Sequence, residues 1–230
     1  MEVAKGKIPI MVGTGATDPL DTLTLTKQAK EEGADAALVV TPMYVKPTQA
    51  GLIDHFTTLA NEIDFPIVLY NVPGRTGCDM VPETVATLAK HKNIVGIKEA
   101  TGDVSRVKTL RELCGPDFLL YSGDDETGAE FVLEGGDGVV SVTSNIMPGV
   151  QSKIMEAALR KDRATVEALN KPLQKLHCDL FCQSNPIVPK WSLWRMGKIK
   201  TNNLRRPLGV LDSAFEERVE SAMREANCQF

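Results

Sequence analysis

A lysine ends an apolar stretch of the chain, in the sequence IVGIKEATGD at residues 94–103. The run is hydrophobic up to Ile97, continues with Lys98, and then breaks at Thr101-Gly102. One interpretation is structural, because a lysine at a strand end lays its stem on apolar surface while its ammonium reaches water. The other is chemical, because burial and neighbouring groups lower a lysine's pKa, and the neutral amine attacks a carbonyl carbon to form a Schiff base.

Polar or small residues also follow the other apolar segments. They are Thr14-Gly15, Thr41-Pro42 with Tyr44, Tyr70-Asn71, Lys98-Glu99, Ser122-Gly123-Asp124-Asp125 and the stretch 141–145. If the segments are parallel strands, all of these residues lie at the same end of the sheet. That end is where α/β proteins keep their chemistry, which favours the chemical interpretation of Lys98.

A regular alternation of strand and helix patterns extends to about residue 160. The apolar segments have the continuous hydrophobicity of strands covered on both faces. They are IPIMVGTG from residue 8, AALVVTP from 36, PIVLYNV from 66, NIVGIKEA from 93, FLLYSGDD from 118 and DGVVSVTSN from 137. Between them, apolar residues recur at three- and four-residue spacing over 18–32, 49–63, 82–91, 104–114 and 126–134. This order predicts an α/β protein with a parallel sheet.

The pattern becomes helical after residue 150. Helices are expected over 151–159, 163–181, 191–196 and 213–226, with a step at Asn185-Pro186. We therefore expect residues 1–160 to form a partial (β/α) barrel and residues 161–230 to form a C-terminal helical region packed on it.

Repeated βα units close either as an open, doubly wound sheet or as a TIM (β/α)8 barrel. A dinucleotide-binding open sheet requires G-x-G-x-x-G after its first strand, but here Gly13 and Gly15 are followed by Asp18 in place of the third glycine. The polar residues at one end of every strand are typical of the catalytic rim of a barrel, so the barrel is favoured.

The composition excludes several classes of partner. The chain has 230 residues, 24% of them charged and 43% hydrophobic, with a net charge of -4. No basic surplus is present to neutralise phosphates, so we expect neither a nucleic-acid nor an anionic-membrane partner. No apolar run is long enough to span a membrane, and the start lacks a secretory signal pattern.

The five cysteines are odd in number and scattered, which fits a reducing, cytoplasmic compartment. They are Cys78, Cys114, Cys178, Cys182 and Cys228. Cys178 and Cys182 lie one helical turn apart with His177 beside them, but no second ligand pair accompanies them. We expect no metal site.

Three stretches carry a family resemblance when they are considered together. They are VTPMYVKPTQ at 40–49, VLYNVPGRTG at 68–77 and GIKEATGD at 96–103. In this order and spacing they resemble the dihydrodipicolinate synthase (4-hydroxy-tetrahydrodipicolinate synthase) family, class I pyruvate aldolases related to N-acetylneuraminate lyase. The resemblance extends through SGDD, GGDGVVSVTSN and NPIVPKW to cover essentially the whole chain.

The resemblance implies a role for each matching residue. Lys98 corresponds to the lysine that forms the Schiff base with pyruvate, and Tyr70 to the tyrosine that relays protons. Arg75 corresponds to the arginine that holds the carboxylate of the second substrate, aspartate β-semialdehyde. Tyr44 matches a tyrosine that completes the relay of a neighbouring subunit, which implies a homo-oligomer, a dimer or a tetramer. Gly123 and Val140 fall where backbone groups line the pyruvate pocket, and no cofactor beyond the covalent imine is implied.

The chain departs from the family at its amino end. The resemblance implies that the first two βα units, about sixty residues, are absent, which leaves six of the eight strands of a closed barrel. The family's G-T-T-G-E loop belongs to that part, so we expect weakened pyruvate binding and proton transfer, and bare edges on the strands at Ile8 and Val139. Met43 also replaces a tyrosine common before Tyr44, and we expect no inhibition by lysine.

Three functional interpretations remain open from the sequence. The first is a lyase of lysine and diaminopimelate biosynthesis that condenses pyruvate with L-aspartate 4-semialdehyde to give 4-hydroxy-tetrahydrodipicolinate. The second is a related sugar-acid pyruvate aldolase, against which Arg75 argues. The third is a truncated, catalytically inactive paralogue that retains Lys98.

Overall fold

The computed structural model describes residues 2–4 and 6–230, which divide into two compact units. One unit comprises the chain up to residue 123 together with 134–137. The other comprises 124–133 and 138–230. All six of the predicted strand segments contain a strand, so the predicted α/β class is confirmed.

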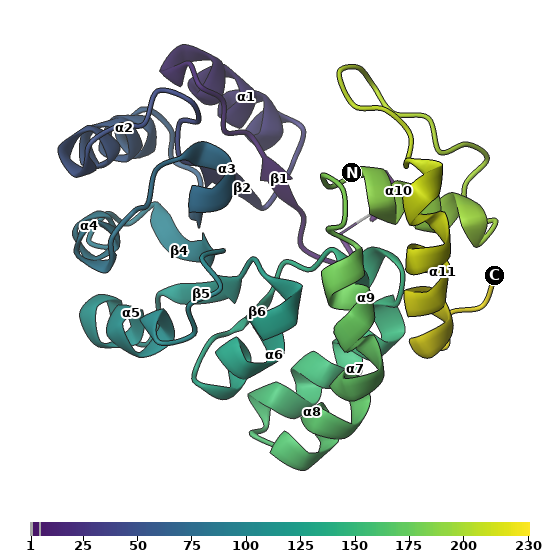
Figure 1. The fold of residues 1–230 in the computed structure, drawn as a ribbon. Helices are drawn as coiled ribbons and strands as arrows, with labels where there is room; N and C mark the ends of the chain where they lie inside the picture. Colours follow the sequence, from purple (N-terminus) through teal and green to yellow (C-terminus); the bar gives the residue numbers. More distant parts are fainter. Residues whose placement is uncertain (1, 5) are drawn as a thin grey trace. The chain divides into compact units, whose positions relative to one another are not determined.

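The first unit is a parallel sheet whose strand order follows the chain (Figure 1). Its strands bury apolar side chains on both faces, as the continuous hydrophobic runs predict, and Val39, Leu69 and Ile97 are fully buried. The strands are β1 (Met11–Gly13), β2 (Ala36–Val40), β3 (Ile67–Asn71), β4 (Ile94–Glu99) and β5 (Leu119–Ser122).

Helices follow these strands, and the four longer ones lie along one side of the sheet (Figure 1). They are α1 (Pro19–Glu31), α2 (Gln49–Glu62), α3 (Pro73–Thr76), α4 (Pro82–Leu88) and α5 (Arg106–Cys114). Side chains cap the first turns of two of these helices: Asp18 accepts a hydrogen bond from a backbone amide of α1, and Thr48 accepts one from a backbone amide of α2. Gly33 and Gly115 follow helices with φ of 83° and 87°, as expected for helix ends. The short α3 was not predicted from the sequence.

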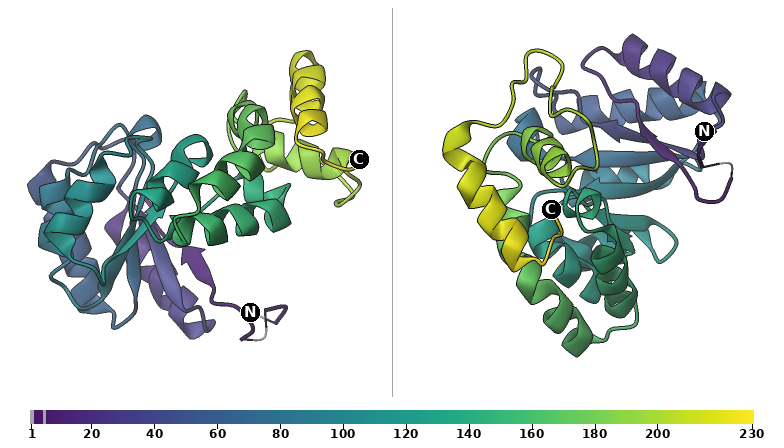
Figure 2. Two further views of the ribbon diagram at one scale, coloured as in Figure 1. Left: turned by 90° about the horizontal axis from the view of Figure 1, so that it is seen from below. Right: turned by 90° about the vertical axis from the view of Figure 1, so that its right-hand side faces the viewer.

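The second unit is mainly helical and surrounds an apolar core that includes Ile154, Leu176, Trp191 and Met223. Figure 2 shows its last helix, α11 (Glu216–Glu225), beside α9 (Gln174–Asp179) and α10 (Ile187–Arg195). The elements are α6 (Asp125–Leu133), β6 (Gly138–Val139), η1 (Thr143–Asn145), α7 (Pro148–Leu159), α8 (Arg163–Asn170), η2 (Lys171–Leu173), α9 (Gln174–Asp179), α10 (Ile187–Arg195), η3 (Ser213–Phe215) and α11 (Glu216–Glu225).

Two expectations for this unit were wrong in detail. The single helix expected over 163–181 is interrupted by η2, because Pro172 has no N–H to donate and its ring restricts the preceding turn. The strand expected from residue 137 is only two residues long. Beyond it the N–H groups of Val142 and Thr143 donate to the carboxylate of Asp125 instead of to a neighbouring strand.

Candidate active site

Lys98 and Tyr70 face each other across two neighbouring strands. They are register partners in the β3–β4 ladder, so their side chains leave the sheet on the same face. The Nζ of Lys98 lies 4.0 Å from the centroid of the Tyr70 ring, a distance at which an ammonium is attracted to the ring face. Lys98 is 9% exposed. Burial raises the pKa of the Tyr70 phenol, and the charge of Arg75 acts in the opposite direction.

Gly123 closes the space beside Lys98. A Cβ added to Gly123 would lie 2.8 Å from Lys98 Cε and 2.6 Å from Ala100 Cβ. The amide of Gly123 donates to the Glu99 carbonyl at 2.7 Å, which keeps the chain after β5 against the end of β4. Only a residue without a side chain fits at this position while Lys98 keeps its place.

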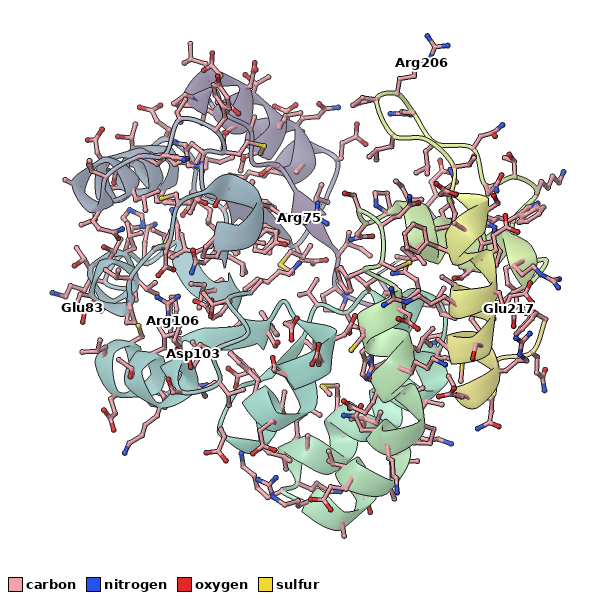
Figure 3. All side chains as sticks on the ribbon, viewed as in Figure 1. Arg75, Glu83, Asp103, Arg106, Arg206 and Glu217 are labelled. Carbon is pink, nitrogen blue, oxygen red and sulfur yellow. The ribbon has the colours of Figure 1, made fainter. Side chains whose placement is uncertain are left out.

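Arg75 lies on α3, the short helix directly after β3. Pro73 starts this helix, and Gly77 ends it with a φ of 71°. Arg75 borders a hollow that Tyr44 and Lys46 also line. Figure 3 shows Arg75 projecting from α3. A guanidinium at this position can hold a carboxylate in one orientation by paired hydrogen bonds.

Tyr44 is close to Arg75 but is not part of the buried pair formed by Lys98 and Tyr70. Its side chain is 90% exposed, and its φ of 73° is unusual for a residue other than glycine. The structure therefore brings Lys98, Tyr70 and Gly123 together and places Tyr44 and Arg75 on one hollow. The roles of all five residues in catalysis or binding stay predictions.

Val140 belongs to the second unit, where it directly follows β6. The turn after it is fixed by the buried carboxylate of Asp125, which accepts hydrogen bonds from the Val142 and Thr143 amides at 2.8 and 2.9 Å. The side chain of Gln151 donates to the same carboxylate at 3.3 Å. The expected contribution of Val140 to a pyruvate pocket stays a prediction.

The sequence interpretation missed a buried network of four polar residues. Asn71 and Glu99, which follow Tyr70 and Lys98 in the chain, are also register partners, and the Nδ2 of Asn71 lies 3.1 Å from Glu99 Oε2. Arg106, in the first turn of α5, donates to Glu99 at 3.1 Å and forms a bidentate pair with Asp79 at 2.9 and 2.8 Å. The alternation of side chains along a strand was the available signal, because it places a polar pair behind the Lys98–Tyr70 pair.

The network is buried where it touches the strands and partly exposed at Asp79. Asn71 is fully buried, and the side chains of Glu99, Arg106 and Asp79 are 2%, 12% and 43% exposed. Burial raises the pKa of Glu99, whereas Arg106 and the hydrogen bonds from Asn71 and Thr101 oppose that shift. Figure 3 shows Arg106 together with Asp103 near the start of α5.

The other side chains offer little alternative chemistry. Within the described residues, no three His, Cys, Asp or Glu side chains are placed to hold a metal ion together. All five cysteines are free. Over the same part of the chain, every helix is too short or too polar to cross a bilayer.

Comparisons with known proteins agree on one family. The model of the dihydrodipicolinate synthetase family matches residues 1–226. The 4-hydroxy-tetrahydrodipicolinate synthase of Methylococcus capsulatus is 52% identical over 98% of this chain and 77% of its own length. The one from Alcanivorax borkumensis is 50% identical, over 97% and 76%. The crystal structure of dihydrodipicolinate synthase from Acinetobacter baumannii, complexed with pyruvate, is similar with a TM-score of 0.96 and 47% identity, covering 99% of this chain and 78% of that one.

Proposed function

The chain belongs to the dihydrodipicolinate synthetase family, whose fold is of the TIM-barrel type, and on that premise we propose how its residues act. We propose that it condenses pyruvate with L-aspartate 4-semialdehyde through a Schiff base on Lys98, giving 4-hydroxy-tetrahydrodipicolinate. The likeness to synthases of that name over 97% to 98% of the chain supports the reaction. The observation that carries the assignment of residues is the Lys98–Tyr70 pair, with Nζ 4.0 Å from the ring centroid.

Lys98 starts the reaction as a neutral amine. Its nitrogen attacks the C2 carbonyl carbon of pyruvate, and the carbonyl oxygen leaves as water once it has been protonated. The positive iminium that forms is an electron sink, so the pyruvate methyl group loses a proton and becomes an enamine. The enamine carbon then forms a bond to the aldehyde carbon of the second substrate, whose oxygen takes up a proton and becomes the 4-hydroxyl group. The amine of that substrate next attacks the imine carbon, which closes the ring of the product and releases Lys98 as a neutral amine. No metal and no cofactor other than the covalent imine takes part in this sequence.

Tyr70 and Arg75 support the two halves of this reaction. The phenol of Tyr70 carries protons to and from the reacting oxygen and nitrogen, which requires a hydroxyl close to the amine. The phenol is protonated at neutral pH, because its ordinary pKa of 10.0 is raised further by burial. The guanidinium of Arg75 holds the carboxylate of L-aspartate 4-semialdehyde in one orientation. Backbone groups of Gly123 line the pyruvate pocket beside Lys98.

Tyr44 extends the proposal to an assembly. Its ring is 90% exposed, and the adjacent Val45 is 58% exposed, so apolar surface gathers beside the Arg75 hollow. We infer that the chain forms a homo-oligomer, a dimer or a tetramer, in which Tyr44 reaches the proton relay of a neighbouring copy.

The free cysteines support a cytoplasmic location.

A substrate panel tests the reaction. The purified 230-residue chain is incubated with pyruvate and either L-aspartate 4-semialdehyde or neutral sugar aldehydes, and the products are identified by mass spectrometry. The proposal predicts a condensation product with the semialdehyde and a much lower rate with the sugar aldehydes, since these have no carboxylate for Arg75. A preference for the sugar aldehydes would contradict it.

A further inference from the structure

Two successive residue pairs at the ends of β3 and β4 point to opposite faces of the sheet. Tyr70 is the register partner of Lys98, and Asn71 is the register partner of Glu99. Because side chains alternate along a strand, the first pair faces the candidate active site and the second faces the helices. Each member of the second pair is covalently adjacent to a member of the first. Whatever fixes Asn71 and Glu99 therefore also fixes the backbone from which Tyr70 and Lys98 project.

The second pair is fixed by hydrogen bonds from several segments. Glu99 Oε1 accepts from the Thr101 amide at 2.8 Å, and Glu99 Oε2 accepts from Asn71 and Arg106, each at 3.1 Å. Asn71 also accepts from the Met80 amide at 2.9 Å. All these groups are buried or nearly so, and a buried polar group that loses its partner is costly. The ends of the two strands are consequently held in one arrangement.

Arg106 joins this pair to the segment that follows α3. Its two Nη atoms lie 2.9 and 2.8 Å from the carboxylate oxygens of Asp79, and Nη1 also reaches Glu99 at 3.1 Å. Asp79 is four residues beyond Arg75 and accepts a further hydrogen bond from Asn71 at 2.8 Å. The guanidinium thus joins the strand that carries Lys98 to the segment next to the helix that carries Arg75. Asn71, which donates to both Glu99 and Asp79, adds the strand that carries Tyr70.

We propose that Arg106 is a positioning residue for the reaction, which holds Lys98, Tyr70 and Arg75 in one geometry through Glu99 and Asp79. This inference rests on the proposed function. Arg106 acts through its neighbours, because its guanidinium donates to the carboxylates of Glu99 and Asp79. Its planar fork suits the task, because a lysine makes neither the bidentate pair with Asp79 nor the third bond to Glu99 in the same geometry.

Removal of Arg106 should affect the rate of chemistry more than the affinity for pyruvate. Glu99 would lose its charged partner, and the ends of β3 and β4 would relax relative to the 77–81 segment. A displacement of roughly 1 Å at the reacting groups costs about 100-fold in rate. The expected effect of Arg106→Ala is therefore a fall of that order in the rate constant for imine formation at saturating pyruvate, with a small change in the pyruvate concentration that gives half the maximal rate.

The test uses rapid mixing of the full chain with pyruvate, borohydride reduction at timed intervals and intact-mass analysis. Arg106→Ala is compared with the wild type, with Arg106→Lys and with Arg111→Ala, which removes another arginine of α5 that pairs with an aspartate, Asp137. Guanidinium ion at tens of millimolar is then added to Arg106→Ala, because a small cation that fills the vacated space restores a positioning role. Asp79→Asn, at the more exposed end of the network, provides a milder variant if Arg106→Ala folds poorly.

The expected results are specific to Arg106. Its alanine variant should regain at least tenfold in rate with guanidinium, the lysine variant should stay slow, and Arg111→Ala should form the imine at nearly the wild-type rate. Wild-type rates in Arg106→Ala, or in a well-folded Asp79→Asn variant, would overturn the inference. So would a slow Arg106→Ala variant that guanidinium leaves unchanged. A wild-type chain that forms no adduct at all would instead contradict the proposed function, and the positioning role with it.

Discussion

Gly123 and Lys98 are packed so closely that the glycine determines where the lysine side chain can lie. A Cβ at position 123 would approach Lys98 Cε to 2.8 Å and Cγ to 3.2 Å, and it would also lie 2.6 Å from Ala100 Cβ. The lysine stem is flexible enough to move away, but Ala100 is held by the β3 backbone through its amide, which donates to Asn71 O at 2.9 Å. Added volume here is therefore relieved largely by displacing Lys98.

Gly123→Ala should consequently slow imine formation without unfolding the protein. A displaced amine loses its alignment with Tyr70, and we expect a fall of roughly 10- to 100-fold in the rate constant for pyruvate trapping. The matched control is Gly149→Ala, where an added Cβ meets nothing within 4 Å. Trapping at the wild-type rate in Gly123→Ala would contradict the assigned position of the Lys98 amine.

Arg75 should govern the second substrate and not the first. Loss of a charged hydrogen bond costs about 1.5–3 kcal/mol, so Arg75→Ala should lower kcat/KM for L-aspartate 4-semialdehyde about 10- to 150-fold. Pyruvate trapping should change little, because the guanidinium is assigned to the other carboxylate. Lys46→Ala, which removes a different cation from the same hollow, is the control. Equal losses in both variants would show that the hollow attracts its substrate by overall charge and that Arg75 has no specific part.

His177 should make the stability of the second unit depend on pH. It is 1% exposed, with Nδ1 2.8 Å from Thr143 Oγ1 and Nε2 2.9 Å from Asn170 Oδ1. Burial lowers its pKa below 6.5, although Asp125, Asp124 and Glu126 act in the opposite direction. Below pH 6.5 the imidazole binds a proton in the unfolded chain but not in the folded one. The contribution of His177 to the free energy of unfolding is therefore present above pH 6.5 and is lost as the pH falls.

Urea unfolding at a series of pH values measures this contribution. One histidine changes the free energy of unfolding by at most about 1.4 kcal/mol per pH unit. His177→Gln should remove this contribution to the fall in the free energy of unfolding below pH 6.5. The carboxylates elsewhere in the chain contribute equally to both proteins, so the comparison isolates the imidazole. Parallel pH dependences in the wild type and the glutamine variant would show that His177 is not held neutral by the fold.

The strands and their functional ends follow from short-range sequence patterns. A run such as PIVLYNV is hydrophobic throughout because its strand is covered on both faces, and the first polar residues mark its carboxyl end. In a parallel sheet those ends meet, so the proximity of Tyr70 and Lys98 follows from the order of β3 and β4. The capping residues Asp18 and Thr48 likewise act within a few residues of their own position.

Features that depend on contacts between distant segments were not accessible in this way. Alternation along β3 and β4 indicates the Asn71–Glu99 pair, but no periodicity reveals that Arg106 joins it to Asp79, which lies after a four-residue helix. The interruption at Pro172 was visible as a residue type, yet the amphipathic pattern on either side of it concealed the break. The short length of β6 depends on Asp125, whose carboxylate accepts hydrogen bonds from the Val142 and Thr143 amides that follow the strand.

Lys98 is proposed to form an imine with pyruvate, and borohydride converts such an imine into a stable amine that can be weighed. The purified chain is incubated with pyruvate, reduced and weighed by intact-mass spectrometry, with a folded Lys98→Ala variant as the control. We expect one added pyruvate unit on the wild type and none on Lys98→Ala. A folded wild-type chain that gains no mass, or an adduct that persists in Lys98→Ala, would contradict it.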